Sequence, residues 1–231
     1  LDYDGTLVGF APRPERAQPD EELRELLKKL ASFPNNKVVL ISGRDKETLE
    51  KWFGDLPLNL VAEHGIWVKE VGKDWEPIES ISSDWKEAIR PIMEAFADLT
   101  PGAFVEEKDY ALVWHYRLAD PELSAVRARE LKDALCDITQ NLDLIVLEGN
   151  KVIEVKPANV TKGRTARYFL EKDRYDFILA VGDDWTDEDL FEAMPENAYT
   201  IKVGFGVSRA KYHVESFREV RKILKKLCET D

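Results

Sequence analysis

The sequence contains little cysteine and no long apolar run, and both absences narrow the class of protein. Only two of its 231 residues are cysteines, Cys136 and Cys228, and each falls within a helical pattern. A small secreted scaffold held by disulfides needs more, so we expect a reducing compartment and assign the protein to the cytoplasm. No stretch is apolar enough to span a bilayer, and no secretory signal opens the sequence, so we expect no membrane association.

The chain also has fewer basic than acidic residues. The chain has 33 lysines and arginines against 45 aspartates and glutamates, which gives a formal net charge of −12. A surface of that sign repels nucleic-acid phosphates and anionic lipids, so we expect neither as a partner and favour a small molecule. With 231 residues, of which 44% are hydrophobic, the chain can bury one large core or two small ones.

Acidic residues are abundant, and they are concentrated in two stretches at opposite ends of the chain. LDYDGTL occupies residues 1–7 and VGDDWTDED occupies residues 181–189. In each stretch, aspartates and a glycine stand where an apolar run stops. The carboxyl ends of parallel strands meet at one edge of a sheet, so the pattern predicts that both groups of carboxylates lie there together. Such a cluster favours a metal and phosphate site, although DYDGTL alone could be a polar turn.

Strands and helices alternate at both ends of the chain but not in its middle. From residue 21 to 63, amphipathic helices alternate with short buried strands. This order is typical of an α/β fold with a doubly wound, mostly parallel sheet. After about Trp67 the pattern changes to two helices with antiparallel strand pairs. We therefore predict a core of residues 1–78 and 158–231 and an inserted α+β cap of residues 79–157.

The first acidic stretch offers the groups that phosphoryl transfer needs. A carboxylate can attack phosphorus and so divide one difficult displacement into two easier ones, and Asp2, the first acid out of the sheet, is the candidate nucleophile. Asp4 lies on the same side of an extended chain and can give a proton to the leaving group and later take one from water. Gly5 permits the sharp turn between them. A hard cation, Mg²⁺ above all, is expected between Asp2, the Asp4 carbonyl and an acid of the second stretch.

Four short motifs occur in an order that resembles the haloacid dehalogenase superfamily of phosphotransferases. They are DYDGT at residues 2–6, a buried strand that ends at Ser42, an isolated lysine at position 162, and GDDWTD at residues 182–187. Longer stretches, among them VEEKDYALVWHYR and VIEVKPANVTKG, resemble the trehalose-6-phosphate phosphatases within that superfamily. This finer resemblance covers nearly the whole chain and does not depend on a single motif.

The resemblance implies a role for six residues: nucleophile Asp2, acid/base Asp4, phosphate ligands Ser42 and Lys162, and metal ligand Asp183 supported by Asp187. The residues by themselves leave alternatives. Ser42, Gly43 and Arg44 could bind phosphate, or they could simply lead into the helix at 45–53 as its N-cap. Lys162 could be a solvated lysine, although a cation at a helix start is unfavourable unless an anion lies nearby. His64 and Gly65, at a strand end, are either a substrate contact or an ordinary loop.

Several positions depart from the family pattern near the expected sugar site. Asn159 and Thr161 stand where the family has a glycine and an asparagine. Asn150 replaces one member of a basic pair, which leaves Lys151 as the expected sugar contact there. The family's first core strand precedes Asp2, so we also expect residues upstream of Leu1.

Substrate selection is expected in the middle of the chain. Glu106 and Lys108 share a face of one strand, His115 and Arg117 share a face of the next, and Glu154 would join them in a polar surface over the active site. Sugars need many donors and acceptors at fixed positions, which such a surface supplies. A charged outer face of a sheet is an equally common explanation. The resemblance implies sugar contacts at Glu106, Lys108, Arg117 and Glu154.

The sequence therefore favours a Mg²⁺-dependent phosphatase that hydrolyses trehalose 6-phosphate. One alternative is another capped sugar phosphatase, acting for example on sucrose phosphate. A second is a non-catalytic sugar-phosphate-binding domain of a trehalose-phosphate synthase. Retention of Asp2, Asp4, Lys162 and Asp183 argues against the second, because a silent domain does not need them all. A fused or associated synthase is an expected partner.

Overall fold

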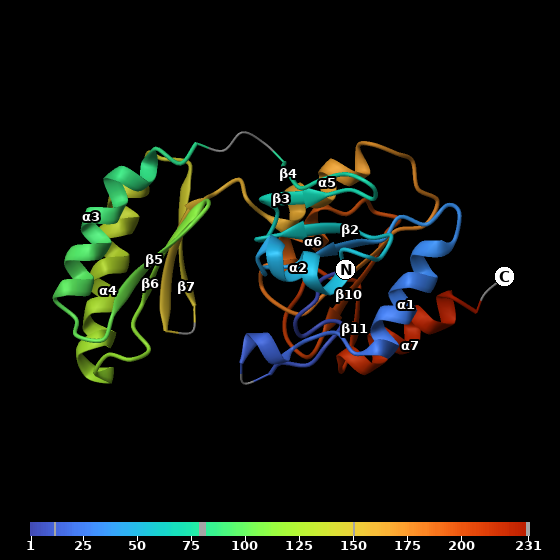
Figure 1. The fold of residues 1–231 in the computed structure, drawn as a ribbon, viewed down its shortest axis with the longest axis horizontal. Helices are drawn as coiled ribbons and strands as arrows, with labels where there is room; N and C mark the ends of the chain where they lie inside the picture. Colours follow the sequence, from blue (N-terminus) through green and yellow to red (C-terminus); the bar gives the residue numbers. More distant parts are fainter. Residues whose placement is uncertain (12, 79–81, 150, 230–231) are drawn as a thin grey trace. The chain divides into compact units, whose positions relative to one another are not determined.

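The protein, seen in a computed structural model, divides into two compact units, one inserted into the other (Figure 1). The first unit joins Leu1–Ile78 to Thr161–Asp231, and the second is Glu79–Val160. Residues 158–160, which the sequence pattern assigned to the core, therefore group with the inserted unit. The structure describes residues 1–11, 13–78, 82–149 and 151–229.

A mostly parallel sheet forms the centre of the first unit. One row of strands runs β1-β2-β3-β4 and another runs β11-β10-β9, and only β3 and β4 are antiparallel to their neighbours. Leu1 and Asp2 lie between the two rows: the Ile41 N–H donates to the Leu1 carbonyl (2.8 Å), and the Asp2 N–H donates to the Val181 carbonyl (3.0 Å). The strands are β1 (Val39–Ile41), β2 (Asn59–Ala62), β3 (Trp67–Lys69), β4 (Glu76–Pro77), β9 (Leu179–Gly182), β10 (Tyr199–Val203) and β11 (Tyr212–Val214).

Helices cover both faces of this sheet, as the alternation of the strand residues requires. Leu40 packs in one core cluster and the adjacent Ile41 in another. The cluster of Leu40 includes residues of α1, α2 and α7, and that of Ile41 includes residues of α5 and α6. The predicted doubly wound α/β fold is confirmed. The helices are α1 (Glu21–Ser32), α2 (Lys46–Phe53), α5 (Lys162–Leu170), α6 (Asp187–Ala193) and α7 (Phe217–Leu227), with a short 3₁₀ helix at Pro14–Arg16.

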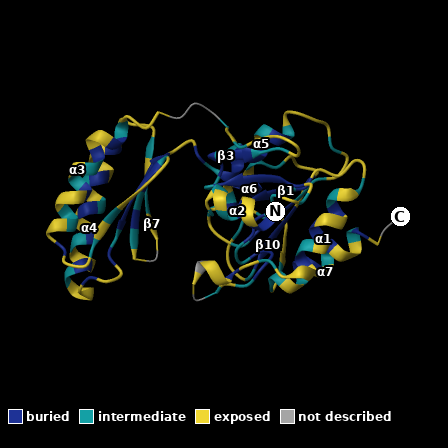
Figure 2. Ribbon diagram, viewed as in Figure 1, coloured by how far each residue is buried: buried dark blue, intermediate teal, exposed yellow. Residues whose placement is uncertain are grey.

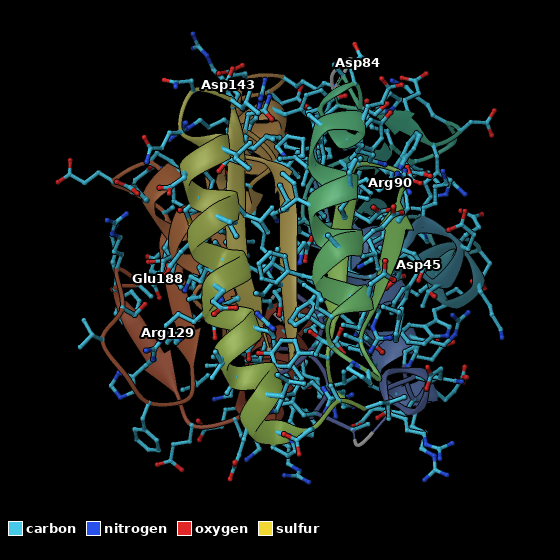
Figure 3. The ribbon with its side chains drawn as sticks, turned by 90° about the vertical axis from the view of Figure 1, so that its left-hand side faces the viewer. Asp45, Asp84, Arg90, Arg129, Asp143 and Glu188 are labelled. Atoms are coloured by element: carbon cyan, nitrogen blue, oxygen red, sulfur yellow. The ribbon has the colours of Figure 1, made fainter. Side chains whose placement is uncertain are left out.

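The second unit is an antiparallel sheet with two helices on one face (Figure 3). The strand order is β5-β6-β8-β7, and α3 and α4 lie over it. Trp114 and Ile153 are fully buried in one cluster with residues of α3 and α4, and alternation turns their neighbours Val113 and Glu154 to the other face. Both helices also carry exposed residues (Figure 2). The elements are α3 (Trp85–Asp98), β5 (Phe104–Lys108), β6 (Ala111–His115), α4 (Pro121–Thr139), β7 (Leu144–Gly149) and β8 (Val152–Pro157).

The helices of the two units share one property. Among the residues that the structure describes, no helix combines the length and the apolar character needed to cross a membrane.

Candidate active site

The acidic motifs meet at one edge of the first unit's sheet, where its parallel strands end. Asp2 directly follows the residue that joins the two strand rows, and Ser42 follows β1. Strand β9 ends at Gly182, and the chain passes through Asp183 before α6 begins at Asp187. Because these strands run in the same direction, Asp2 and Asp183 become neighbours although they lie far apart in the sequence.

A buried lysine holds the carboxylates of two motifs. The Lys162 Nζ lies 2.7 Å from Asp2 Oδ1 and 2.8 Å from Asp187 Oδ1, and all three side chains are almost completely buried. Burial by itself would lower the pKa of Lys162, but the negative charges of Asp2 and Asp187 outweigh it and raise that pKa. Lys162 is therefore a fixed cation, and the interpretation of it as a solvated lysine is wrong.

The second carboxylate oxygen of Asp187 shapes the loop between β9 and α6. It accepts hydrogen bonds from the backbone N–H groups of Asp183 (3.1 Å) and Asp184 (3.0 Å). Only glycine fits at position 182, because a Cβ there would lie 2.2 Å from the Asp187 carboxyl carbon. The ammonium of Lys202 in β10 donates to the Asp183 carbonyl and secures the loop from the other side. Both carboxylate oxygens of Asp187 are thus engaged in organising the site.

Asp183 carries a charge that the protein does not fully balance. Its burial, reinforced by the negative charge of Asp2, raises the pKa of Asp183 to about 7. The Thr6 hydroxyl donates to Asp183 Oδ1 over 3.1 Å. Gly5, with a φ of +83°, passes so close that a Cβ would lie 2.1 Å from Asp183 Oδ2. Asp183 is therefore pressed against the turn that follows the first motif.

These carboxylates fit a divalent cation. Asp2, Asp183 and Asp187 each offer one oxygen, and the three oxygens lie within 4.8 Å of one another. Asp2 Oδ2 is buried and accepts no hydrogen bond from the described residues. Two like charges in a buried site are costly unless a cation lies between them, and oxygen donors of this kind suit Mg²⁺. Asp187 is already bonded to Lys162 and the loop, so Asp2 and Asp183 are the side chains best able to hold it.

Asp4 is paired with an arginine through both of its oxygens. Arg44 donates from Nε to Asp4 Oδ2 (2.8 Å) and from Nη2 to Asp4 Oδ1 (2.6 Å), and its guanidinium lies over the Trp52 ring at 4.5 Å. The Ser42 hydroxyl accepts from the Arg44 backbone N–H (3.2 Å). Asp45 is the residue that caps α2, so the interpretation of Ser42 as its N-cap is wrong.

His64 and Gly65 lie beside the loop that follows β1. The His64 N–H donates to the Ser42 carbonyl over 2.9 Å, and a Cβ on Gly43 would lie 2.5 Å from His64 Nε2. Both His64 (φ 60°) and Gly65 (φ 124°) adopt the left-handed region, a conformation that is costly for histidine. The structure thus brings Ser42, Gly43, Arg44, His64 and Gly65 to the same edge of the first unit as the acids.

The remaining predicted site residues belong to the second unit, and four of them lie on its strands. Glu106, Lys108, His115 and Glu154 share the sheet face opposite the helices by alternation. Glu106 Oε2 and His115 Nε2 are 2.6 Å apart, and the His115 ring stacks on Phe104 with centroids separated by 4.7 Å.

Arg117 departs from the predicted pattern, and Lys151 lies outside the strands as well. β6 ends at His115, and the Ala119 N–H donates to the Tyr116 carbonyl (3.2 Å) to close a turn that contains Arg117. The expectation that Arg117 shares a strand face with His115 is corrected: it lies exposed in the turn after β6. Lys151 follows β7 with its ammonium 5.5 Å from the Tyr116 ring centroid. Asn150 lies outside the described residues.

Structural comparison defines the class of protein first. The chain superposes on a haloacid dehalogenase-like hydrolase from B. subtilis with a TM-score of 0.68 at 15% identity, over 98% of each chain. That likeness shows the fold. A sequence model of the trehalose-phosphatase family matches residues 1–222, and the chain belongs to this family. The predicted family resemblance is confirmed.

Relatives within the family match over most of this chain. A bifunctional trehalose-6-phosphate synthase/phosphatase of Thermoproteus tenax is 44% identical over 98% of the chain and 31% of that relative. A trehalose-phosphatase of Saccharomyces cerevisiae is 40% identical over 84% of the chain and 24% of its own length. The C-terminal domain of a C. albicans trehalose-6-phosphate phosphatase has a TM-score of 0.84 at 33% identity, covering 99% of this chain and 91% of that domain. The chain thus spans about a third or less of the curated relatives it matches.

Sequence reasoning gave no role to Thr6 or Lys202, although both contact Asp183. The signal for Lys202 was a lysine within the apolar run of IKVG, which is otherwise typical of a buried strand. The signal for Thr6 was its place in the first motif, where a hydroxyl next to acidic residues can donate to them.

The bridging lysine generates a prediction about stability. Replacing Lys162 by methionine leaves Asp2 and Asp187 buried without their shared cation, so we expect the free energy of unfolding at pH 7 to fall by about 3 kcal/mol. Losing the cation raises the pKa of Asp187 further, and protonation then relieves the repulsion. The loss should therefore shrink as the pH falls below that raised pKa.

Urea unfolding at pH 7 and at pH 4.5 measures both effects. Asp187→Asn and the double variant Lys162→Met/Asp187→Asn complete a cycle, in which the double variant should lose less than the sum of the single losses. Additive losses, or a loss that grows toward acid pH, would contradict the electrostatic role of Lys162.

Proposed function

We propose that this chain is a Mg²⁺-dependent phosphatase that hydrolyses trehalose 6-phosphate to trehalose and phosphate. The observation that carries the proposal is the buried Asp2 carboxylate, oriented by Lys162 and adjacent to Asp183. Membership of the trehalose-phosphatase family, together with the names of the S. cerevisiae and C. albicans relatives, supports the substrate. Mg²⁺, when bound by Asp2 and Asp183, would supply positive charge to the transferring phosphoryl group.

The two oxygens of Asp2 have different tasks in this reaction. Oδ1 is held by Lys162, which fixes the orientation of the carboxylate. Oδ2 has no hydrogen-bond partner among the described residues and is the attacking atom. Its attack on phosphorus breaks the bond to the sugar oxygen and forms an aspartyl-phosphate. Ser42 and Lys162 contribute a hydroxyl and a cation to the binding of the phosphate.

Asp4 handles the protons in both halves of the reaction. It gives a proton to the departing sugar oxygen and later takes one from the water that attacks the aspartyl-phosphate. Arg44 occupies both oxygens of Asp4 in this structure. Asp4 can therefore act only after Arg44 has released at least one oxygen, and the substrate phosphate is an alternative partner for the guanidinium. His64 and Gly65 border the same loop and complete this side of the phosphate site.

The sugar is bound by the second unit through the polar face of its sheet. The side chains of Lys108 and Glu154 make no hydrogen bond or ion pair with the other described residues, so their charged groups are available to sugar hydroxyls. Glu106, His115, Arg117 and Lys151 are further candidate contacts. A disaccharide offers hydroxyls in many directions, and a site that pairs with them rejects sugars that leave its polar groups unpaired.

A synthase domain is a proposed partner. The T. tenax relative combines synthase and phosphatase in its name, and a Dictyostelium discoideum relative, 40% identical over 98% of this chain, is called a trehalose-phosphate synthase. In both, this chain covers about 30% of the length, which leaves room for a second activity.

The substrate is tested by phosphate release from a panel of sugar phosphates, measured with and without Mg²⁺. We expect trehalose 6-phosphate to give the highest kcat/KM. A higher value for sucrose phosphate or glucose 6-phosphate would assign the site to another sugar, and no turnover of any ester would favour a binding domain.

The nucleophile is tested by Asp2→Asn. Asparagine is nearly isosteric but too poor a nucleophile to form the acyl phosphate, so phosphate release should fall at least 10³-fold, roughly the contribution expected of a covalent nucleophile. Circular dichroism should remain unchanged. Asp173→Asn, which alters an exposed acid outside the site, is the matched control and should keep full activity. Comparable rates for the Asp2 variant and the control would refute the mechanism.

The metal is tested by chelation and by substitution at Asp183. EDTA should abolish activity and Mg²⁺ should restore it, whereas Ca²⁺ should inhibit, because its looser coordination misplaces the nucleophile relative to phosphorus. Asp183→Ala should raise the half-saturating Mg²⁺ concentration or end turnover. Glu188→Gln removes an acid in the first turn of α6, outside the cluster, and should leave the Mg²⁺ requirement unchanged. Full activity in excess chelator would contradict the proposed Mg²⁺ requirement.

The proposed recognition of the sugar by the second unit is tested by comparing the kinetics of variants on two substrates. We expect kcat/KM for trehalose 6-phosphate to fall by about tenfold to a hundredfold in each of three variants, Lys108→Ala, Arg117→Ala and Glu154→Ala. Truncating the side chain leaves polar groups of the sugar without a hydrogen-bond partner. Hydrolysis of p-nitrophenyl phosphate, which has no sugar, should change little. Lys132→Ala, on the helical side of the same unit, is the matched control. Equal losses on both substrates would point to damaged phosphate chemistry, and no loss on either would make these residues a solvated face.

A further inference from the structure

A second buried lysine, Lys86, lies far from the acidic motifs in the sequence, in the second unit. It occupies the second position of α3, and its side chain is only 7% exposed. A cation at the start of a helix faces the positive end of the helix dipole, and burial adds a desolvation penalty. Lys86 therefore requires strong compensating contacts, and the structure provides them.

Those contacts all belong to the hairpin formed by β5 and β6. The Lys86 Nζ donates to the backbone carbonyls of Lys108 and Asp109, the second over 2.7 Å, and lies 3.3 Å from Glu107 Oε1. An ammonium has three N–H donors, and three acceptors surround this one. Arg90, one turn further along α3 (Figure 3), donates to the Glu107 carboxylate. Lys86 thus holds the backbone of the turn, whereas Arg90 holds one side chain of the strand.

The turn itself is poorly suited to the hairpin it closes. Lys108 pairs with Ala111, which leaves a two-residue loop of Asp109 and Tyr110. Favoured two-residue hairpin loops need a positive φ at one or both loop residues, usually supplied by glycine or asparagine. Neither Asp109 nor Tyr110 has a positive φ. The turn therefore depends on an external clamp, and Lys86 is placed to provide it.

The clamp and the proposed sugar contacts lie on opposite faces of the same strand. Glu107 points toward the helices, where Lys86 and Arg90 bind it, and alternation turns Glu106 and Lys108 to the other face. Lys108 is the last residue of β5, next to the turn, so a displacement of the turn moves its side chain directly.

We infer that Lys86 is a positioning residue for sugar recognition: it fixes the Lys108–Asp109 turn from behind, so that the Lys108 ammonium is presented to the substrate in one orientation. This inference rests on the proposed sugar-phosphatase function. It assigns Lys86 no contact with the substrate. Lys86 keeps the turn ordered before the substrate binds. Without Lys86, binding of the substrate would have to order the turn.

The test uses Lys86→Met, which keeps the apolar stem and removes the donors, with Arg90→Met as the matched loss of charge from the same helix. Lys86→Met should raise KM for trehalose 6-phosphate about fivefold to tenfold, comparable to the cost of ordering a residue or two, and leave kcat within twofold. Both constants for p-nitrophenyl phosphate should stay within twofold. Hydrogen exchange should quicken at residues 108–111. Arg90→Met should change none of these quantities.

A rescue separates positioning from general stability. Asp109→Asn with Tyr110→Gly installs a loop that favours the hairpin turn by itself, so adding both to Lys86→Met should bring KM back toward the wild-type value. Where thermal unfolding shows that Lys86→Met has lost its fold, Lys86→Gln, which keeps one donor, takes its place with the same expected split between the substrates.

Two outcomes would overturn the inference. One is faster exchange at the turn with an unchanged KM for the sugar phosphate while Lys108→Ala still loses activity selectively. The other is an equal loss on both substrates that the new loop does not restore. If Lys108→Ala does not selectively reduce activity on the sugar phosphate, the proposed role of the second unit in sugar recognition is wrong. The inference about Lys86 is then wrong as well.

Discussion

The buried ion pairs of Lys162 with Asp2 and Asp187 are the constraint on which the first unit depends. The three residues come from three separate segments, and their side chains are removed from water almost completely. Charges in such a place are tolerated only when their partners are accurately placed. This requirement bears on where the second unit is inserted. The chain leaves the first unit at Ile78 and returns at Thr161, one residue before the bridging lysine. Thr161 also caps α5 through its side chain, so the returning chain is directed into the helix that carries Lys162.

Most of the carboxylates at this edge of the sheet are paired with basic side chains, so their mutual repulsion does not prevent folding. Lys162 balances Asp2 and Asp187, Arg44 balances Asp4, and Lys202 binds the Asp183 carbonyl while leaving its carboxylate unbalanced. Burial of that carboxylate, together with the negative charge of Asp2 beside it, raises the pKa of Asp183. Glycines at positions 5 and 182 let the backbone approach the carboxylates too closely for any side chain. The remaining negative charge is therefore concentrated in a small volume, which is the property that a divalent cation requires.

Much of this arrangement could be predicted because strand direction alone brings the motifs together. Asp2, Ser42 and Asp183 all follow parallel strands, so their convergence needed only the pattern of apolar runs. The pairing of Arg44 with Asp4 could not be predicted, since it depends on side-chain directions in a loop. The position of Arg117 was missed because the apolar pattern runs on through Tyr116, whereas a turn closed between Ala119 and Tyr116 ends the strand. The roles of Lys202 and Lys86 were missed because a lysine is usually assigned to the surface.

Two of the buried lysines, Lys162 and Lys86, are stabilised in the same physical way but have different effects. Each lies at the first or second position of a helix, where the dipole opposes it, and each is stabilised by groups from other segments. For Lys162 the acceptors are carboxylates, so the lysine sets the charge and protonation of the groups around it. For Lys86 two of the three acceptors are neutral backbone carbonyls, so its main effect is on the path of the chain. A lysine that would be unfavourable in a solvated helix thus becomes a fixed reference point in each unit, one for electrostatics and one for shape.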